Sequence, residues 1–440
     1  MTASSLAGLC GIALVTVGAF GASEVVVKRP VQSGKVVVLY WEKWTGSEGE
    51  EMQKTVDAFN RSQDKIFVRY LSIADVNDKT LLATAGGDPP DVAGLWAGQV
   101  PQFSDVNALT DLKSMATAAG LTADYYIPAY WNQLNFHGGL WALPSTPASV
   151  AMHVNVDKLP PQYKDPNNFP KTIEDFDTLV DTLNQKTSDG RLKLAGFMPS
   201  EPGWWNFAWG GWFGGKLIDG DRLTINSKEN VEGFQWVRHF KDSMGTQQIQ
   251  AFQSGFGNSS SPQDAFMDGK VATELHGVYK ANYIHLYNPG MHWYAVPVPY
   301  PKDRPDLAGH TVIDQDVLMI PAGASHPKEA FEFIRYIQRQ DVMESLCMRH
   351  GKNSPLARVS QNFLTHHPNP FIKLFDQLAR SPNAIAAPMI GIQPQIMDEM
   401  GNVFQEVSQG HKSPKEALDE AQARLDDEWK TYRQQVLNEK

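Results

Sequence analysis

The first hundred residues alternate between strand and helix patterns, and this alternation limits the folds that the chain can adopt. Residues 35–41 (KVVVLYW) form a continuous apolar run with β-branched side chains, typical of a strand covered on both faces. An amphipathic helix pattern follows, and two more strands are predicted at 66–71 and 91–96, with a short helix at 79–84. A β-α-β-α-β order predicts a parallel sheet with right-handed crossovers, and therefore an α/β fold.

Similar patterns continue through the rest of the chain. Strands are predicted at 138–144, 150–156 and 312–320, and the C-terminal quarter is helical. A length of 440 residues is enough for two or three domains. Because we find no internal repeat and no long low-complexity linker, we expect two cores joined by several short crossings.

The composition is that of an ordinary soluble protein, with 42% hydrophobic and 20% charged residues. The net charge of −10 argues against a nucleic-acid partner and against an anionic membrane surface, because both favour a basic face. We therefore expect neither partner.

The N-terminus has the pattern of an export signal. Residues 6–22 are almost wholly apolar or small and end in the small-x-small sequence Ala19-Phe20-Gly21. We expect residues 1–22 to be a signal peptide, or an uncleaved anchor, because no Lys or Arg precedes the apolar run. Without this segment Cys347 is the only cysteine, so no internal disulfide is expected and core packing must stabilise the protein.

Residues 203–215 (GWWNFAWGGWFGG) carry four of the 12 tryptophans among five glycines. Each glycine costs roughly 1 kcal/mol in a helix interior, and the run is too short to cross a membrane. Two interpretations remain open: indole rings exposed for stacking on sugar rings, or a tryptophan-rich core element. On the first interpretation, Trp204 and Trp205 are the preferred stacking residues.

Several motifs, in order, resemble an extracellular solute-binding protein of the carbohydrate class (maltose type, family 1) that serves ABC importers. The segment LLATAGGDPPDVAGLWAG is similar to the family's GDxPDV loop and third strand, and GGLWALPSTPASVAMHVNVDKL to its G-x-x-Y-G-L-P segment and following strand. AFMDGKVATELHGVY and HPKEAFEFIRYIQRQDVMESL resemble two later family motifs. Trp141 replaces a tyrosine, and Tyr279 stands where the family usually has tryptophan.

The resemblance implies a periplasmic-binding-protein-like (type II) fold with two discontinuous α/β lobes, a hinge and an interlobe cleft. The N-terminal lobe would comprise residues 35–146 and 302–348, and the C-terminal lobe residues 150–297 and 352–440. It also implies an exported, periplasmic protein that binds a carbohydrate and delivers it to ABC permease subunits. We expect a monomer without a cofactor, a metal or catalytic residues.

Ligands bind open α/β sheets at the carboxyl ends of the strands. The candidate ligand-binding residues therefore end a predicted strand, flank a predicted crossing, carry a tryptophan or occupy a family position. They are Trp41, Glu42, Trp44, Trp96, Ser145, Thr146, Trp204, Trp205, Gly277, Tyr279, Asp314, Gln315, Asp316 and Arg349. For several of them, core packing or a role in a turn explains the residue equally well, and these alternatives stay open.

Two other functions, glycoside hydrolysis and the binding of an anionic ligand, would need different residues. A glycoside hydrolase needs two carboxylates that flank one bond, and no short motif assigns such a pair here. An anionic ligand such as a glycerol phosphodiester would need cationic side chains in the cleft, for which Arg349 is the candidate. Because the predicted cleft segments are aromatic and weakly acidic, the sequence favours a neutral mono- or oligosaccharide.

Overall fold

The computed structural model describes residues 34–199 and 205–437. The predicted signal or anchor segment 1–22 and the stacking candidate Trp204 lie outside the described residues. Within the described part of the chain, no helix has both the length and the apolar character needed to cross a membrane.

Three parallel strands begin the sheet, as the sequence predicts. β1 (Val36–Glu42) lies between β2 (Ile66–Ser72) and β3 (Val92–Trp96) and pairs in parallel with both. The crossover helices are α2 (Gly46–Ser62) and α3 (Val76–Ala85). α2 buries its predicted apolar stripe against the sheet, which is the arrangement that an amphipathic period of 3.6 residues favours.

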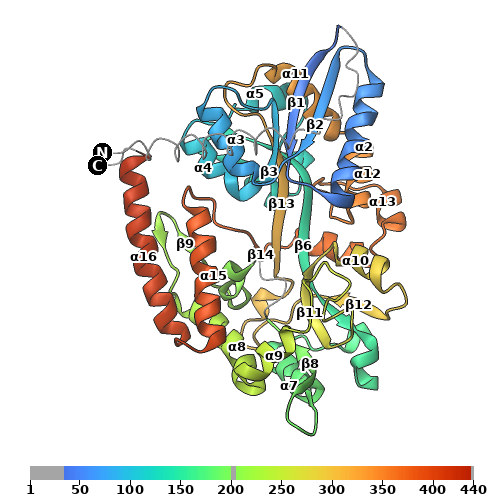
Figure 1. The fold of residues 1–440 in the computed structure, drawn as a ribbon, viewed down its shortest axis with the longest axis vertical. Helices are drawn as coiled ribbons and strands as arrows, with labels where there is room; N and C mark the ends of the chain where they lie inside the picture. Colours follow the sequence, from blue (N-terminus) through green and yellow to red (C-terminus); the bar gives the residue numbers. More distant parts are fainter. Residues whose placement is uncertain (1–33, 200–204, 438–440) are drawn as a thin grey trace, which may run out of the picture.

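Two long strands join the halves of the molecule. β6 (Leu143–Asn155) is buried along all 13 residues and pairs antiparallel with β13 (Thr311–Met319). Both run through the centre of Figure 1, from the upper half into the lower half. The sheet order is β2-β1-β3-β13-β6-β11-β8-β7, so one sheet crosses from one half to the other.

The remaining elements surround this sheet. The other strands are β4 (Asn135–Phe136), β5 (Gly139–Leu140), β7 (Gln185–Lys186), β8 (Leu192–Phe197), β9 (Ile218–Asp219), β10 (Arg222–Leu223), β11 (Val271–Gly277), β12 (Trp293–Val296) and β14 (Ala384–Ile385). The other helices are α4 (Val100–Asp105), α5 (Lys113–Ala118), α6 (Pro128–Asn132), α7 (Ile173–Leu183), α8 (Lys228–Met244), α9 (Thr246–Gln253), α10 (Lys280–Tyr287), α11 (Pro327–Ile337), α12 (Gln340–His350), α13 (Gln361–His366), α14 (Ile372–Ala379), α15 (Gln393–Gln409) and α16 (Pro414–Gln435).

The buried apolar residues form two large clusters. The first cluster is drawn mainly from residues 38–148 and 317–378, and the second mainly from 150–298 and 390–429. Each cluster therefore collects segments far apart in the sequence, as expected for discontinuous lobes. Phe363 of α13 and Phe375 of α14 belong to the first cluster, although the predicted boundaries assign them to the second lobe, because α13 lies against α12 and α14 lies against β6. The lobe boundaries themselves stay a prediction.

The tryptophan-rich segment is a core element in the described residues. Trp205, Trp209 and Trp212 are fully buried in the second cluster. The glycines let this segment lie directly on α8: a Cβ at Gly210 would come within 1.9 Å of Asn230 Oδ1, and one at Gly233 within 2.2 Å of the Trp209 carbonyl oxygen. The glycine-tryptophan pattern thus serves close packing.

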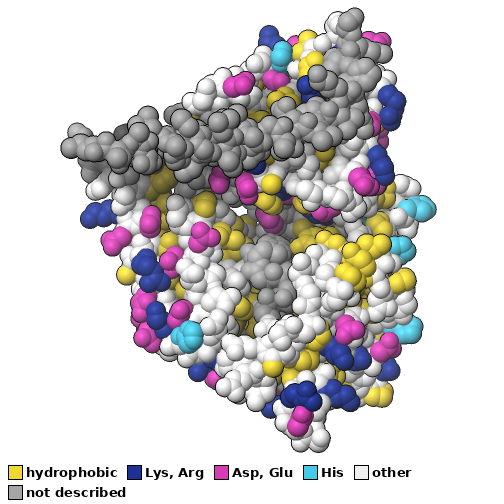
Figure 2. Space-filling view, in the orientation of Figure 1, with side chains coloured by type: hydrophobic (Ala, Val, Ile, Leu, Met, Phe, Trp, Pro, Cys, Tyr) yellow, Lys and Arg dark blue, Asp and Glu magenta, His cyan; other side chains and the backbone are white. Residues whose placement is uncertain are grey.

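The outer face has mixed charge. In Figure 2, Lys and Arg side chains are interspersed with Asp and Glu side chains along the left edge, where α16 lies in Figure 1. Ion pairs such as Lys412–Glu420 and Arg424–Glu399 contribute to this pattern.

Candidate functional site

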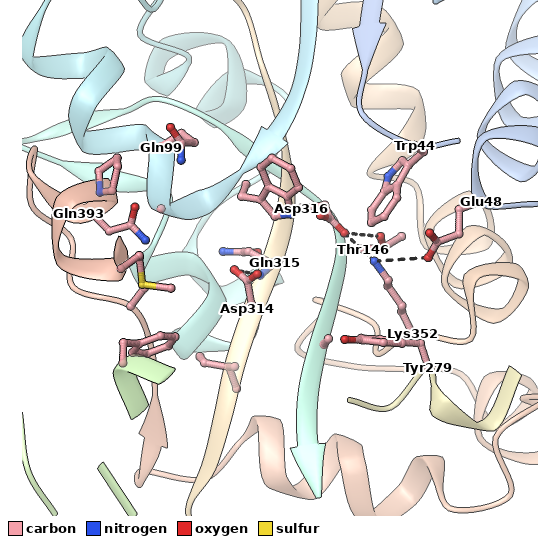
Figure 3. A pocket seen from close by; sticks show the side chains of 18 of the residues that line it. Trp44, Glu48, Gln99, Thr146, Tyr279, Asp314, Gln315, Asp316, Lys352 and Gln393 are labelled. Carbon is pink, nitrogen blue, oxygen red and sulfur yellow. Dashed lines mark hydrogen bonds and ion pairs between the residues drawn. The ribbon is translucent and has the colours of Figure 1, made fainter. Parts of the chain in front are cut away.

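A cavity of about 570 Å³ lies between the two clusters, and residues of both line it. The central strands contribute Thr146 and Ala148 from β6 and residues 313–316 from β13 (Figure 3). The full lining is Trp44, Glu48, Trp96, Gly98, Gln99, Thr146, Ala148, Phe207, Tyr279, Tyr283, Ile313, Asp314, Gln315, Asp316, Lys352, Ala387, Gln393, Pro394, Met397 and Asp398. Its size is in the range of small-molecule sites.

A register shift in β13 brings three consecutive polar side chains to this cavity. In a regular strand, neighbouring side chains point to opposite faces of the sheet. Here the pairing with β6 shifts between Gln315 and Val317, and Asp314, Gln315 and Asp316 all line the cavity. Bulges often redirect a side chain in this way next to functional sites.

Asp316 is the most heavily bonded carboxylate of the cavity. It is only 4% exposed, and its Oδ2 accepts hydrogen bonds from Thr146 Oγ1 (3.0 Å) and Lys352 Nζ (2.8 Å). Lys43 Nζ lies 3.1 Å from Oδ1. Burial alone would raise the pKa of Asp316, but Lys352 and Lys43 outweigh it and hold this pKa below its ordinary value. Asp316 is therefore ionised and structurally fixed.

The two lysines also lie over the aromatic wall. Lys352 Nζ is 3.9 Å from the centroid of the Trp44 ring and 5.8 Å from that of Tyr279, and it lies 4.0 Å from Glu48 Oε1. Lys43 Nζ is 4.6 Å and 4.8 Å from the Trp44 and Trp96 ring centroids. These cation–π contacts fix the positions of the rings.

Asp314 has a different environment. It is half-buried, its Oδ1 accepts a hydrogen bond from the Gln315 amide nitrogen (2.8 Å), and no Lys or Arg of the described residues forms an ion pair with it. Burial, and then the neighbouring charge of Asp316, raise the pKa of Asp314 to about 7. Asp314 therefore presents a carboxyl group to the cavity that changes its charge near neutral pH.

Two glutamines add acceptor oxygens. Gln315 Nε2 donates to the Tyr130 carbonyl oxygen (2.6 Å) and to Gln133 Oε1 (3.1 Å), which fixes the orientation of its amide. Among the described residues its Oε1 is buried without a hydrogen-bond partner, as is that of Gln393. Unpaired buried acceptors are costly, so a small side-chain movement that brought either oxygen to a ligand hydroxyl or N–H would be favourable.

Seven predicted site residues line the cavity, and six others lie elsewhere. The seven are Trp44, Trp96, Thr146, Tyr279, Asp314, Gln315 and Asp316. Trp96 is the most accessible of the aromatic candidates that the structure describes, at 39% exposed, as its position at the end of β3 predicts.

The other six are placed by packing or by local pairing. Trp41 packs against the first cluster, Glu42 is fully buried and accepts a hydrogen bond from the Tyr40 hydroxyl, and Ser145 is fully buried in β6. Trp205 is enclosed in the second cluster, so its ring presents no free face to the cavity.

The last two residues, Gly277 and Arg349, lie against neighbouring side chains. Gly277 gives room to Tyr279, since a Cβ there would lie 2.4 Å from the tyrosine ring. Arg349 Nε lies 2.8 Å from Glu51 Oε2, and Arg349 points to α2 rather than to the cavity. Arg349, Trp205, Trp41, Glu42, Ser145 and Gly277 thus do not line this cavity, and their ligand contacts stay a prediction.

The sequence interpretation missed Glu48, Gln99, Lys352 and Gln393, among others. Lys352 lies within the crossing predicted at 349–353, and it lines the cavity where Arg349 does not. Gln99 and Gln393 are almost 300 residues apart, and no local pattern connects them. Within the described residues, no group of three or more His, Cys, Asp or Glu side chains is arranged to hold a metal ion.

Comparison with known proteins gives the same fold. The model of a family described as bacterial extracellular solute-binding protein matches residues 54–359. The search of curated proteins finds no match. Similar solved structures are CpMnBP1 with mannobiose bound (TM-score 0.77, 23% identity, 88% of this chain and 99% of that chain) and the sugar-binding protein MalE from the phytopathogen Xanthomonas citri (0.77, 20%, 92% and 100%).

The GacH receptor of Streptomyces glaucescens, whose structures include a complex with acarbose, is also similar (TM-score 0.70, 17% identity, 92% of this chain and 100% of that chain). At these identities the likeness is one of fold. It confirms the predicted α/β architecture of periplasmic-binding-protein type.

Proposed function

The chain belongs to the bacterial extracellular solute-binding protein family, and from this premise we propose that it binds a mono- or oligosaccharide in the cavity between its two clusters and delivers it to the permease of an ABC importer. Proteins of this family bind solutes and do not catalyse reactions. Mannobiose and acarbose, bound by similar structures, make a saccharide the first ligand class to consider.

The observation that carries this proposal is the combination of an accessible aromatic ring with unpaired acceptors in one cavity. Trp96 offers a partly exposed indole face, while Asp314 and Gln315 offer acceptor oxygens. Sugar rings have apolar C–H faces and hydroxyl donors at their edges, so both features find a partner. Stacking on an aromatic ring contributes about 0.5–1.5 kcal/mol beyond the area that it buries.

An anionic ligand such as a glycerol phosphodiester fits less well. Lys43 and Lys352 are both paired with Asp316, and Arg349 is paired with Glu51 outside the cavity. An anion would also meet the acceptor oxygens of Asp314 and Gln315 without donating to them. The lining therefore favours a neutral saccharide.

A hydrolytic mechanism is also disfavoured by the carboxylates. Asp316 is held ionised by two lysines, so it is a poor proton donor. Asp314 lies two residues away on the same strand, whereas glycoside hydrolysis uses two carboxyl groups on either side of the bond.

Closure around the ligand would use contacts that already connect the halves. Gln393 of α15 lies directly against Gly98, where a Cβ would come within 2.8 Å of its Nε2. The Tyr432 hydroxyl of α16 donates to Asp105 Oδ2 of α4 (2.9 Å). A ligand shifts the population toward the closed form only by binding this form more tightly.

The permease partner and the site of action follow from the family and from the N-terminal pattern. We expect the protein to be exported, with residues 1–22 as its signal or anchor, and to meet the permease outside the cytoplasm as a monomer. Co-purification with a permease from membranes, with and without saccharide, tests the predicted permease partner separately.

A thermal-shift screen of monosaccharides and oligosaccharides, next to phosphodiesters and polyamines, tests the ligand class. A true ligand at about 100 times its dissociation constant adds about 2.7 kcal/mol to the free energy of unfolding. Stabilisation by a saccharide without release of reducing sugar supports the proposal. Stabilisation by the phosphodiesters alone would contradict it.

A further inference from the structure

The two ends of the cavity differ in charge balance. In Figure 3, Trp44, Glu48, Lys352 and Tyr279 lie on one side, and Asp314, Gln315, Gln99 and Gln393 on the other. On the first side Lys352 neutralises Asp316 and lies near Glu48. On the second side the described residues place no cation within ion-pair distance of Asp314.

Lys43 and Lys352 do not neutralise Asp314, because other groups already hold them. Lys43 Nζ already contacts three oxygen atoms, those of Glu42 Oε1 (3.3 Å), the Leu95 carbonyl (3.1 Å) and Asp316 Oδ1 (3.1 Å). Lys352 is held by Asp316 Oδ2 and lies over the Trp44 ring. The neighbouring Gln315 donates its backbone N–H to Asp314 Oδ1 (2.8 Å), but its side chain brings no cation to this carboxylate.

Resting on the proposed function, we propose that Asp314 is the specificity-determining residue of this site: it selects against saccharides that carry a carboxylate and favours those that carry hydroxyl or ammonium donors next to it. A ligand hydroxyl or ammonium donates to the free Asp314 oxygen. A ligand carboxylate placed there meets a like charge in a partly desolvated site, where electrostatic interactions are much stronger than in water.

The charged groups that face Asp314 set its response to pH. Asp316 disfavours its ionisation, while Lys352 and Lys43 favour it at longer range, and Glu48 and Asp398 complete the acidic lining. Because the pKa of Asp314 is about 7, its charge grows between pH 6 and pH 8. Sugar carboxylates remain ionised over this range. Discrimination against them should therefore increase with pH.

The test compares matched saccharides by isothermal titration calorimetry. The best neutral ligand of the screen is compared with its own acidic form, made by oxidising its primary hydroxyl, and hexoses are compared with the corresponding hexosamines and hexuronates. For the wild type at pH 8, we expect the acidic form to bind at least about tenfold more weakly than the neutral form, and the ratio to shrink at pH 6.

The variant Asp314→Asn keeps the shape and one acceptor oxygen, and it should reduce the neutral-to-acidic ratio to within about threefold and abolish its pH dependence. Asp124→Asn, which removes an exposed carboxylate in the N-terminal part of the chain, should leave the neutral-to-acidic affinity ratio unchanged. General damage to the site would weaken all ligands alike, so the ratio isolates the charge effect.

Should Asp314→Asn fail to fold, the pH dependence of the wild-type ratio decides the question alone. An equal ratio at pH 6 and pH 8, or an unchanged ratio in a folded Asp314→Asn, would overturn the inference while neutral binding, and with it the proposed function, stands. If no saccharide binds at all, the proposed function fails first.

Discussion

Asp314 and Asp316 lie two residues apart on β13, yet Asp316 is paired with Lys43 and Lys352 while Asp314, among the described residues, is bonded to the backbone amide of Gln315. The Asp316 carboxylate is part of the framework of the cavity, and the Asp314 carboxylate is available to a ligand. Burial acts on both, but only Asp316 has cations close enough to compensate for it.

Removing the Asp316 carboxylate should destabilise the protein. Asp316→Asn leaves two buried ammonium groups without their shared partner, and breaking a buried pair costs about 3–5 kcal/mol. Urea unfolding measures this loss. In the double variant with Lys352→Met, the loss should be smaller than the sum of the two single losses. Strict additivity would show that the pair is not coupled.

Two tryptophans of the sequence interpretation should respond differently. Trp96→Ala removes a partly exposed ring of the cavity and should weaken saccharide binding about tenfold, with little change in the free energy of unfolding. Trp205→Ala removes a fully buried ring of the second cluster and should cost about 3–5 kcal/mol of stability. Calorimetry and urea unfolding of both variants separate these roles, and equal effects on affinity in two folded variants would refute the assignment.

Acid should begin to destabilise the protein at pH values well above those at which ordinary carboxyl groups titrate. Burial lowers the pKa of His153 and His350 to about 3, and that of His310 and His367 to about 4. An unfolded histidine binds its proton near pH 6.5, so between about pH 6.5 and 4 the unfolded state holds more protons and folding stability falls as the pH falls.

Urea unfolding at pH 7, 6 and 5 measures this slope. His310→Gln should make the slope shallower by about one proton, because it removes one of the buried titrating groups. A free energy of unfolding that stays constant from pH 7 to pH 5 would show that these rings are not buried as described.

The contact between Tyr432 and Asp105 should bias the molecule toward its closed form. Tyr432→Phe removes a hydrogen bond that joins α16 to α4, and its net contribution is about 0.5–3 kcal/mol. Without ligand, the variant should show a larger radius of gyration in small-angle scattering and bind saccharide more weakly. Tyr287→Phe, on an exposed ring of α10, is the matched control. Identical scattering from both variants would contradict this bias.

Local patterns in the sequence predict the sheet and its crossovers, because strand runs and helix stripes are properties of neighbouring residues. Asp314, Gln315 and Asp316 interrupt the otherwise apolar strand predicted at 312–320, and this polar break is likewise a property of neighbouring residues. What the sequence could not show is the shifted pairing with β6 that turns all three toward the cavity, since register depends on the partner strand.

Backbone geometry also decides that Lys352, rather than the predicted Arg349, lines the cavity. α12 ends at His350, and Gly351 after it adopts a left-handed conformation (φ 63°) and sits against Asn282. The chain turns there, and Lys352 reaches Asp316. For Trp205 the pattern fitted both a core and a stacking role. Its burial in the second cluster, whose members are far apart in the sequence, decides for the core role.

A crystal structure with the best saccharide of the screen tests the central claim most directly. We expect the sugar in the cavity between the two clusters, with one ring on Trp96 and a hydroxyl within hydrogen-bond distance of Asp314. A saccharide bound elsewhere on the molecule, with this cavity empty, would contradict it.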